Sequence, residues 1–508
     1  NLLPFDSFPE RVTEARMQQI LQSARDANMN MLRMWGGGYY QSDAFYAMAD
    51  KLGLMIWQDF MFGGAVPPYD EAFRENTRIE ASEQVMRLRD HPSIVLWCGN
   101  NEVQTGWESW PDRQKFAQAI GSAERARVEH GMRTLFGETL RGVVQRYTPD
   151  LPYWASSPST DFDGPANVPD DGDMHVWNVW AGSAPIEDYL KTTPRFQSEY
   201  GLQSLPALAT IQTFAAPADL SPDSPVMRAH QKFDGGNGNQ RLLFYIRKSY
   251  GEPKDFGSFI YLSQVMQAEG IELAADHLRS ARPQSMGSLY WQLNDVWPGA
   301  SWSSIDYFGR WKALQFHARR FYAPLRVAPI RRDGRTEVFL VSDRTTPLDA
   351  QLRTRVMDMD GRLLHEQVDQ VHVPALSSIR AAELTDMALL QGADPHRSYA
   401  VFELIEQGRP VSRHLLYFEP ALALQLPDPG LHAEIANSGH GLVLNVRAAR
   451  LAREVWIDFG PLDARVSDNA FDLLPGERVE LQIAGTASIA SLRDALHVRS
   501  LFDAAVHY

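Results

Sequence analysis

The chain has 508 residues, of which 44% are apolar and 22% charged, and its formal net charge is −14. This length exceeds what a single hydrophobic core usually supports, so we expect one large domain followed by smaller ones. The negative charge argues against a nucleic-acid partner, because neutralising phosphates needs clustered Lys and Arg. The sequence holds no apolar run of about 18 residues, which argues against a membrane span.

The single cysteine, Cys98, excludes a disulfide within the chain. This fits a reducing compartment, but it also fits a periplasmic protein that avoids cysteine. We expect a soluble protein and slightly favour a periplasmic or secreted location over the cytoplasm. The sequence begins Asn1-Leu2-Leu3 without an initiator Met or a signal core, and we expect it to be the downstream part of a longer protein.

The first 320 residues alternate short apolar runs with amphipathic stretches. Helices are predicted at 11–28, 43–52 and 70–90, and strands at 2–6, 29–35, 54–57, 93–98, 152–156, 173–180, 195–199 and 286–292. Near-continuous apolar strands separated by helices are typical of buried parallel sheets. Eight of them predict a (β/α)8 TIM barrel over residues 1–324. A doubly wound open sheet is the rival, although the Gly-rich phosphate turn that such sheets often carry is missing.

The pattern changes after residue 324. Apolar and polar residues then alternate with a period of two in 335–341, 352–357, 399–404 and 414–418. This period indicates antiparallel strands that bury one face. We predict an immunoglobulin-like β-sandwich at 325–420, a proline-containing linker at its end, and a C-terminal β-sandwich at 421–508.

Polar and aromatic residues gather where the predicted barrel strands end. Chemistry in such barrels lies at the carboxyl ends of the strands. The residues near these ends are Asp6, Trp35, Asp59, Glu102, Trp180, Glu199 and Trp291. Twelve of the thirteen tryptophans lie in the first 311 residues, and their faces are suited to stacking on sugar rings.

Glu102 and Glu199 are the strongest catalytic candidates. They follow the fourth and seventh predicted strands, which face each other across a barrel of eight. Glycoside hydrolysis needs one carboxylic acid to protonate the leaving oxygen and a second carboxylate to attack the sugar or to activate water. The two glutamates can approach the separation of about 5 Å that retention of configuration requires.

The motifs around these glutamates resemble a known family. Residues 97–102 (Trp-Cys-Gly-Asn-Asn-Glu) and 198–201 (Ser-Glu-Tyr-Gly) are similar to the acid/base and nucleophile motifs of glycoside hydrolase family 2. Within that family the β-mannosidases are the most similar. This comparison rests on residues 31–38, 57–62, 175–177 and 290–295, on the segment from Trp302 to Trp311, and more weakly on 467–469 and 473–477.

The resemblance implies a role for each site residue. Glu102 is expected to be the general acid and then the base, with a pKa raised by its surroundings, and Glu199 the nucleophile. Asn101 is expected to bind the 2-hydroxyl and Asp59 another ring hydroxyl. The expected pocket walls are Trp35, Trp110 and Trp291, with Trp177 near the mouth. The mechanism needs no metal, and we expect no cofactor.

The resemblance also implies what is missing and what else is open. Family members carry a sugar-binding-like β domain and an immunoglobulin-like domain before the barrel, and we expect such domains of the same protein to complete the pocket. The expected substrate is a small β-mannoside, cleaved at its non-reducing end with retention. The alternatives are another β-glycosidase of the family, such as a β-galactosidase or a β-glucuronidase, and a carbohydrate-binding protein without activity.

Overall fold

The computed structural model describes residues 1–439 and 441–505, and the chain divides into two compact units. Unit 1 comprises Asn1–Leu202 and Gln284–Trp297, and unit 2 comprises Gln203–Pro283 and Pro298–Tyr508. Within the described residues, no helix combines the length and apolar character needed to cross a bilayer.

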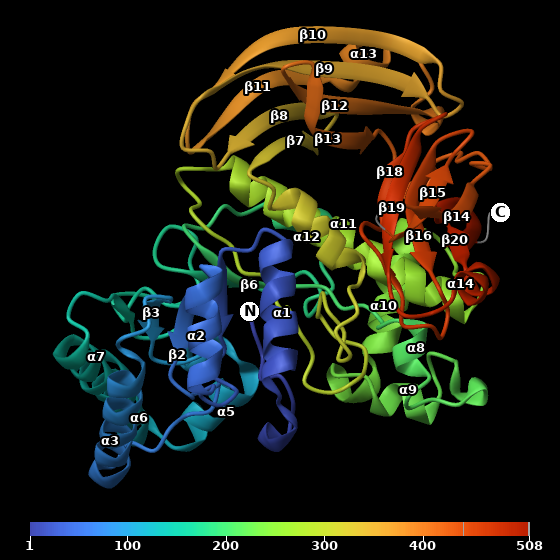
Figure 1. The fold of residues 1–508 in the computed structure, drawn as a ribbon. Helices are drawn as coiled ribbons and strands as arrows, with labels where there is room; N and C mark the ends of the chain where they lie inside the picture. Colours follow the sequence, from blue (N-terminus) through green and yellow to red (C-terminus); the bar gives the residue numbers. More distant parts are fainter. Residues whose placement is uncertain (440, 506–508) are drawn as a thin grey trace. The chain divides into compact units, whose positions relative to one another are not determined.

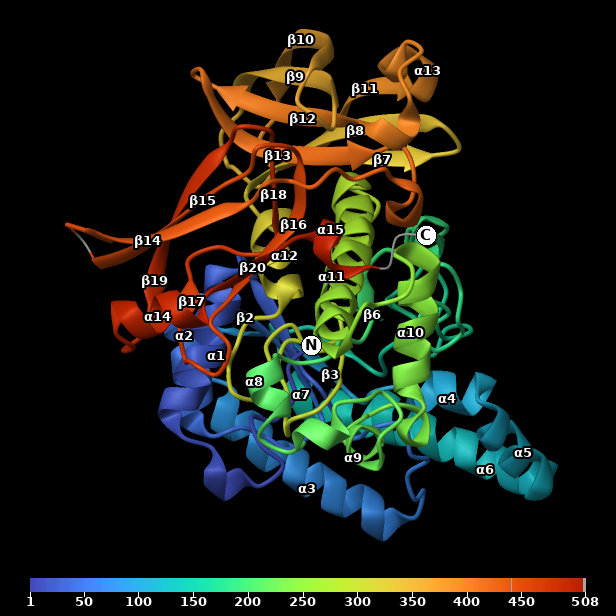
Figure 2. The same ribbon diagram turned by 90° about the vertical axis from the view of Figure 1, so that its right-hand side faces the viewer.

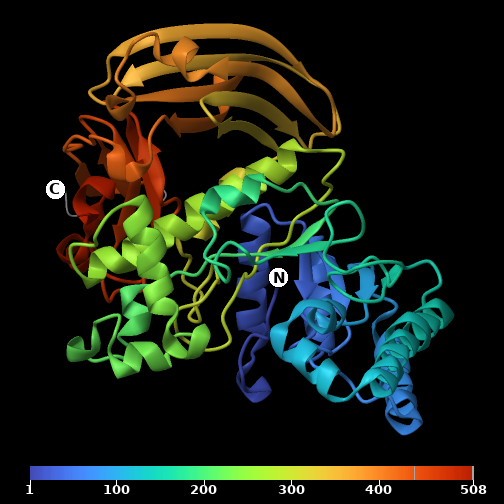
Figure 3. The same ribbon diagram turned by 180° about the vertical axis from the view of Figure 1, so that it is seen from behind.

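Unit 1 contains parallel strands with helices between them (Figures 1 and 3). Four strands form one sheet in chain order: β1 (Met31–Met34), β2 (Met55–Asp59), β3 (Ile94–Cys98) and β4 (Tyr153–Trp154). A second parallel pair consists of β5 (Met174–Val176) and β6 (Gln197–Tyr200). The helices of this unit are α1 (Glu14–Asp26), α2 (Asp43–Leu52), α3 (Glu71–Leu88), α4 (Val103–Ser109), α5 (Pro111–Ala119), α6 (Ser122–Met132) and α7 (Arg141–Tyr147), with a π-helix at Arg133–Leu140.

The α/β character of this unit is confirmed, but the strands are shorter than predicted. The first and last predicted strands are reduced to single parallel bridges, Leu2 with Met34 and Ser288 with Gln197. In the part of the chain that the structure describes, no ladder joins β4 to β5, so the strands form two sheets and not one closed barrel. The connection from β4 to β5 contains three prolines, which cannot donate ladder hydrogen bonds.

The predicted ends of the early helices have a local cause. Gly53 ends α2 in the left-handed conformation with φ 67°, which glycine adopts without a steric penalty. The carboxylate of Asp70 accepts from the Phe73 N–H and thereby caps α3. Such local signals place helix ends well even where strand lengths depend on distant partners.

Unit 2 begins with helices. These are α8 (Leu208–Ile211), α9 (Pro225–Ala229), α10 (Gly238–Ser249), α11 (Phe256–Ser280) and α12 (Ala313–Phe321). The 25-residue α11 is buried along most of its length, as expected for a helix with neighbours all around it. Figure 2 shows α11 running toward the strands of the following sandwich.

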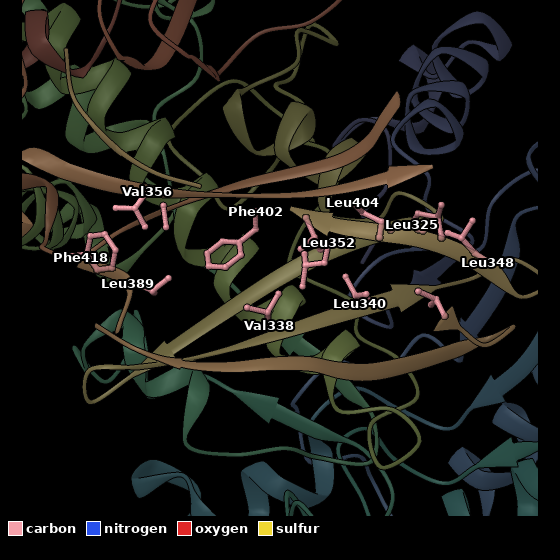
Figure 4. Packing of buried hydrophobic residues seen from close by; sticks show 14 residues of the cluster. Leu325, Val338, Leu340, Leu348, Leu352, Val356, Leu389, Phe402, Leu404 and Phe418 are labelled. Carbon is pink, nitrogen blue, oxygen red and sulfur yellow. The ribbon is translucent and has the colours of Figure 1, made fainter. Parts of the chain in front are cut away.

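An antiparallel sandwich follows α12. One sheet has the order β10-β9-β12-β13 and the other the order β11-β8-β7. The strands are β7 (Leu325–Arg332), β8 (Arg335–Ser342), β9 (Leu348–Asp358), β10 (Leu363–Val373), β11 (Ser377–Thr385), β12 (Ser398–Glu406) and β13 (Arg409–Tyr417), with α13 at Asp386–Leu390. Figure 4 shows Phe402 and Leu352 facing Val338 and Leu340 across the core. The predicted alternation is confirmed in β8 and in residues 352–357 of β9. In β12, residues 398–405 are all buried, because Tyr399 and Val401 belong to a second apolar cluster on the other face.

A second sandwich completes unit 2. Its two sheets have the orders β14-β15-β19-β17 and β18-β16-β20. The strands are β14 (His432–Ser438), β15 (Gly441–Arg447), β16 (Ala452–Asp458), β17 (Arg465–Val466), β18 (Phe471–Leu473), β19 (Arg478–Ala484) and β20 (His497–Arg499), with helices α14 (Ile489–Ala495) and α15 (Leu501–Ala504). A further apolar cluster joins the two sandwiches through Tyr399, Leu424 and Leu451.

Candidate active site

Arg33, on β1, is the centre of a buried polar cluster in unit 1. Its fully buried side chain donates to Glu199 Oε1 at 2.8 Å and to Asp59 Oδ2 at 2.9 Å. It also donates to Asn101 Oδ1 at 2.9 Å and to Asn1 Oδ1 at 3.2 Å. Burial alone would lower the pKa of Arg33, but the charges of Asp59 and Glu199 outweigh burial and raise it. A permanent cation therefore stands beside Glu199.

Asp59 anchors this cation. Its two oxygens accept from Arg33 Nε and Nη2, from Trp57 Nε1 at 2.9 Å and from the Gly36 N–H at 3.0 Å. Burial raises the pKa of Asp59, and the neighbouring Arg33 partly offsets this effect. Since both oxygens are occupied, a sugar hydroxyl could bind Asp59 only by displacing one of these donors.

Asn101 has a fixed amide orientation. A guanidinium can only donate, so the atom of Asn101 that faces Arg33 at 2.9 Å must be Oδ1. The Nδ2 group is thereby directed toward Glu102, whose Oε2 lies 3.5 Å away. Asn101 can thus offer an N–H to a ligand beside the carboxyl group of Glu102.

Glu102 occupies a strained backbone position immediately before α4. Its φ of 57° lies in the left-handed region, which non-glycine residues adopt at a cost of about 1–3 kcal/mol and mostly at functional sites. Its N–H donates to the carbonyl of Ser157 at 2.8 Å, and its Oε1 lies 2.8 Å from His175 Nδ1. The side chain of Glu102 is 18% exposed, whereas that of Glu199 is 4% exposed.

Glu199, on β6, accepts hydrogen bonds from Arg33 and from Trp177. The Nε1 of Trp177 lies 3.2 Å from Glu199 Oε2. His175 Nδ1 lies 3.5 Å from the same oxygen. Trp177, predicted near the mouth, therefore contacts the predicted nucleophile directly.

The two glutamates lie close together with different surroundings. One carboxylate oxygen from each lies within 4.8 Å of the other, and His175 lies within the same distance of both. Burial raises the pKa of Glu102 to about 7, although the charge of Arg33 opposes the shift. Burial also raises the pKa of Glu199, together with the nearby Glu102 carboxylate and against the charge of Arg33. At neutral pH, Glu102 is therefore partly protonated, and Glu199 is bound by a cation.

The predicted aromatic walls occupy two places. Trp35 and Trp291 pack edge to face, with ring centroids 5.1 Å apart. Trp110 lies at the other end of α4 from Glu102 and packs over Gly64 and Gly106, where an added Cβ would come within 3.2 Å of its ring. Trp35 and Trp291 are thus paired, while the ring of Trp110 lies over Gly64, whose N–H donates to the carbonyl of Asn101 at 2.7 Å.

Two residues predicted near the carboxyl ends of the barrel strands, Asp6 and Trp180, are buried. Asp6 is 2% exposed and accepts from the Phe8 N–H at 2.9 Å. Trp180 is fully buried with a φ of 74°. The predicted strand ends at 6 and 180 therefore contribute to packing and turns in the structure.

Arg33 and His175 are the site residues that the sequence analysis missed. Both lie within the segments that carried the resemblance, 31–38 and 175–177. Arg33 could have been recognised as the only charged residue within the apolar strand 31–34, because a buried cation needs buried anions nearby. His175 is one of fourteen histidines in the chain, and only its place between two carboxyl groups distinguishes it.

Two regions of this chain match known domain families. Residues 334–421 match the Mannosidase Ig/CBM-like domain, and residues 426–504 match the Ig-fold domain family named Ig_mannosidase. A crystal structure of an exo-chitosanase from Amycolatopsis orientalis has a TM-score of 0.71 at 16% identity over 97% of this chain and 61% of its own, which indicates a shared fold alone.

More specific relatives extend over nearly the whole chain. A beta-mannosidase of Capra hircus is 33% identical over 99% of this chain and 59% of its own length. A beta-mannosidase B of Aspergillus niger is 29% identical over 97% of this chain and 60% of its own. The crystal structure of a beta-D-mannosidase from Dictyoglomus thermophilum has a TM-score of 0.88 at 30% identity over 98% of this chain and 59% of its own.

The chain is thus similar to beta-mannosidases over nearly its whole length, and the predicted resemblance to them is confirmed. It spans about three fifths of the length of the curated relatives it matches, 59% for the goat protein.

Proposed function

We propose that this chain contains the catalytic machinery of a retaining exo-β-mannosidase, a glycosidase that releases mannose from the non-reducing end of β-mannosides. The mannose assignment is supported by relatives named beta-mannosidase that match nearly the whole chain. The hydrolytic assignment is supported by the paired glutamates.

The observation that carries the proposal is the approach of Glu102 and Glu199. Their carboxylate oxygens come within 4.8 Å. Retaining glycosidases separate their carboxyl groups by about 5–5.5 Å, whereas inverting enzymes need about 6.5–9.5 Å to admit a water molecule. This spacing favours direct attack by a carboxylate.

The roles follow from the surroundings of each carboxyl group. Glu199, ionised beside Arg33, attacks the anomeric carbon while Glu102 gives its proton to the departing glycosidic oxygen. A covalent glycosyl-enzyme results. Glu102, now a carboxylate, takes a proton from water as that water attacks the anomeric carbon and releases Glu199. The free enzyme is regenerated, and the sugar is released with its original anomeric configuration.

The pocket is proposed around this pair. Asn101 offers its N–H to the sugar 2-hydroxyl, a contact that strengthens in the transition state. Trp35 and Trp291 form one wall, and Trp177 fixes Glu199 and borders the sugar. For Trp110 we propose another part of the wall, beside Gly64 and Asn101 and toward the leaving group. Asp59 acts chiefly by holding Arg33.

We also propose the architecture predicted from the sequence. The two parallel sheets, together with the segments bridged at Leu2 and Ser288, would be parts of one catalytic (β/α)8 barrel over residues 1–324. Residues 325–420 would form an immunoglobulin-like sandwich and 421–508 a C-terminal sandwich. The part of the relatives that this chain does not span would add domains that complete the pocket, and the partner would be a small oligosaccharide or glycoside.

The test is a panel of p-nitrophenyl β-glycosides assayed with the complete protein. We expect the mannoside to be cleaved at least tenfold faster than the galactoside and glucuronide. Glu199→Ala should be inactive, and the exposed Glu138→Ala should serve as its matched control. Faster cleavage of the galactoside or glucuronide would overturn the sugar assignment. Binding of mannosides by a folded protein that cleaves none of the panel would support a carbohydrate-binding protein instead.

A further inference from the structure

A second polar chain extends from the opposite edge of the His175 ring. His175 Nε2 lies 3.1 Å from Ser157 Oγ, and Ser157 Oγ lies 2.6 Å from Asp173 Oδ2. Asp173 also accepts from the Ser198 hydroxyl and, through Oδ1, from the Ser159 N–H at 3.1 Å. Asp173, Ser157 and Ser198 are at most 4% exposed, and none of the proposed catalytic steps uses them.

The number of protons available determines which atom donates in each of these hydrogen bonds. A serine hydroxyl has one proton, and an ionised carboxylate can only accept. Ser157 therefore donates to Asp173, and its oxygen accepts from an N–H at Nε2 of His175. Burial lowers the pKa of His175 to about 4, against the charge of Glu199, so the neutral ring carries only one proton. Nδ1 is then an acceptor, and it faces Glu102 at 2.8 Å.

We infer that Asp173 is a positioning residue which, through Ser157, fixes His175 in the tautomer that accepts the proton of Glu102. The inference rests on the proposed role of Glu102 as general acid. In the resting protein, the Glu102 carboxylic acid donates to Nδ1, and ionised Glu102 would face a lone pair. The leaving oxygen of a bound substrate competes with Nδ1 for the same proton.

The opposite tautomer would have the opposite effect. With its proton on Nδ1, His175 would donate to ionised Glu102 and stabilise the carboxylate, because charge-assisted hydrogen bonds are the stronger ones. Glu102 would then lose its proton at lower pH. The hydrogen bonds from His175 through Ser157 to Asp173 thus help to keep Glu102 protonated near neutral pH.

Other charged and titratable groups lie around the hydrogen-bonded row of Asp173, Ser157 and His175. They are Arg33 from β1, Asp59 from β2, Cys98 from β3 and Glu199 from β6. Arg33 favours ionised Glu102. Burial raises the pKa of the Cys98 thiol well above its ordinary value, so this thiol stays neutral. The variants proposed below leave all four groups in place.

The experiment is the pH profile of kcat/KM for the complete protein, read at the basic limb. Asp173→Asn should move this limb to lower pH by about one unit. Loss of the Asp173 charge would itself favour ionised Glu102, so Ser157→Ala is the decisive variant. It retains that charge, breaks the link, and should move the limb in the same direction. Ser198→Ala removes the other hydroxyl from the same carboxylate oxygen and should leave the limb in place.

A limb that stays in place in Ser157→Ala, or that moves equally in Ser198→Ala, would overturn the inference. Neutron diffraction on the unmodified protein gives an answer that does not depend on activity or on the folding of a variant. Deuterium on Nε2 of His175 supports the inference, and deuterium on Nδ1 overturns it. If the unmodified protein cleaves no glycoside, the proposed function fails, while the tautomer can still be read.

Discussion

Two buried clusters in this protein combine arginine, histidine and carboxylate side chains but have different roles. In unit 1, Arg33 binds Asp59 and Glu199, with His175 and Glu102 alongside. In unit 2, Arg326 on β7 binds Glu272 and Asp276 of α11, with 2.6 Å between Arg326 Nη2 and Asp276 Oδ2. His317 of α12 bridges Glu272 to Glu454, with Nε2 lying 3.1 Å from Glu454 Oε2.

The clusters differ in where their protons lie. Burial opposes the charge of His317, but Glu454 and Glu272 outweigh it and raise its pKa to about 10. Burial also opposes ionisation of Glu272, but the charges of His317 and Arg326 hold its pKa well below its ordinary value. Around Arg33 the outcome is the reverse, with neutral His175 and a Glu102 whose pKa is about 7. In unit 2, paired charges join elements of the fold, whereas the less compensated carboxyl group of Glu102 can transfer a proton near neutral pH.

The comparison predicts its largest effect at Glu199. Glu199→Ala should lower kcat by about 10⁴-fold or more, because the step that forms the covalent intermediate is lost. Single-turnover kinetics on an activated mannoside would measure it. Azide should restore turnover by attacking from the vacated side and give a product of inverted configuration. Retained activity without azide would exclude Glu199 as nucleophile.

Breaking the unit 2 cluster should affect stability and leave the chemistry intact. Arg326→Met takes the cation away from buried Asp276 and leaves Glu272 with His317 as its cation, and such a loss typically costs about 3–5 kcal/mol. Thermal unfolding should show a Tm several degrees lower, with kcat near that of the unmodified protein at 25 °C. Arg335→Met provides the matched control, because its ion pair with Glu383 is 68% and 42% exposed and worth little. Equal Tm shifts in both variants would contradict this assignment.

Arg33 should respond in the opposite way. Arg33→Lys keeps one positive charge but cannot reproduce a planar fork that reaches Glu199, Asp59 and Asn101 together. We expect kcat/KM to fall by about 10²-fold, and the acid limb of the pH profile to move upward as Glu199 loses its strongest donor. Unchanged kcat/KM would indicate that the cluster is structural, like its counterpart in unit 2.

The pH profile itself sharpens the comparison. Glu102 must be protonated to assist departure of the leaving group, and its pKa is about 7. Activity on a substrate with a poor leaving group should therefore fall about tenfold per unit as pH rises above 7. In Glu102→Gln this basic limb should vanish for an activated substrate, whose leaving group needs no proton. A limb that persists there would belong to another group.

The smallest effects are expected at the aromatic walls. Trp291→Phe should raise KM for a simple mannoside about tenfold, since stacking on the sugar is worth about 1–2 kcal/mol. Trp110→Phe should leave KM for p-nitrophenyl mannoside nearly unchanged and weaken binding of longer oligosaccharides. Equal effects on the simple mannoside would place Trp110 at the same wall as Trp291.

Local patterns in the sequence determined much of this protein. Helix ends follow from single residues such as Asp70 and Gly53, and the alternation in 352–357 predicts a sandwich strand because one face must be buried. The motif context singled out Glu102 and Glu199, because an Asn-Glu pair and a Glu at a strand end are visible without any partner.

Only the tertiary structure decided the environment of these groups. Arg33 and Glu199 are 166 residues apart, yet they form a hydrogen bond of 2.8 Å. The protonation of His175 likewise depends on Ser157 and Asp173, which reach it from outside its own strand. The number of strands also depends on such partners, because the segments at Leu2 and Ser288 form only single bridges. Burial and charge pairing act through space, so the pKa values that separate an acid from a nucleophile cannot be read from sequence spacing.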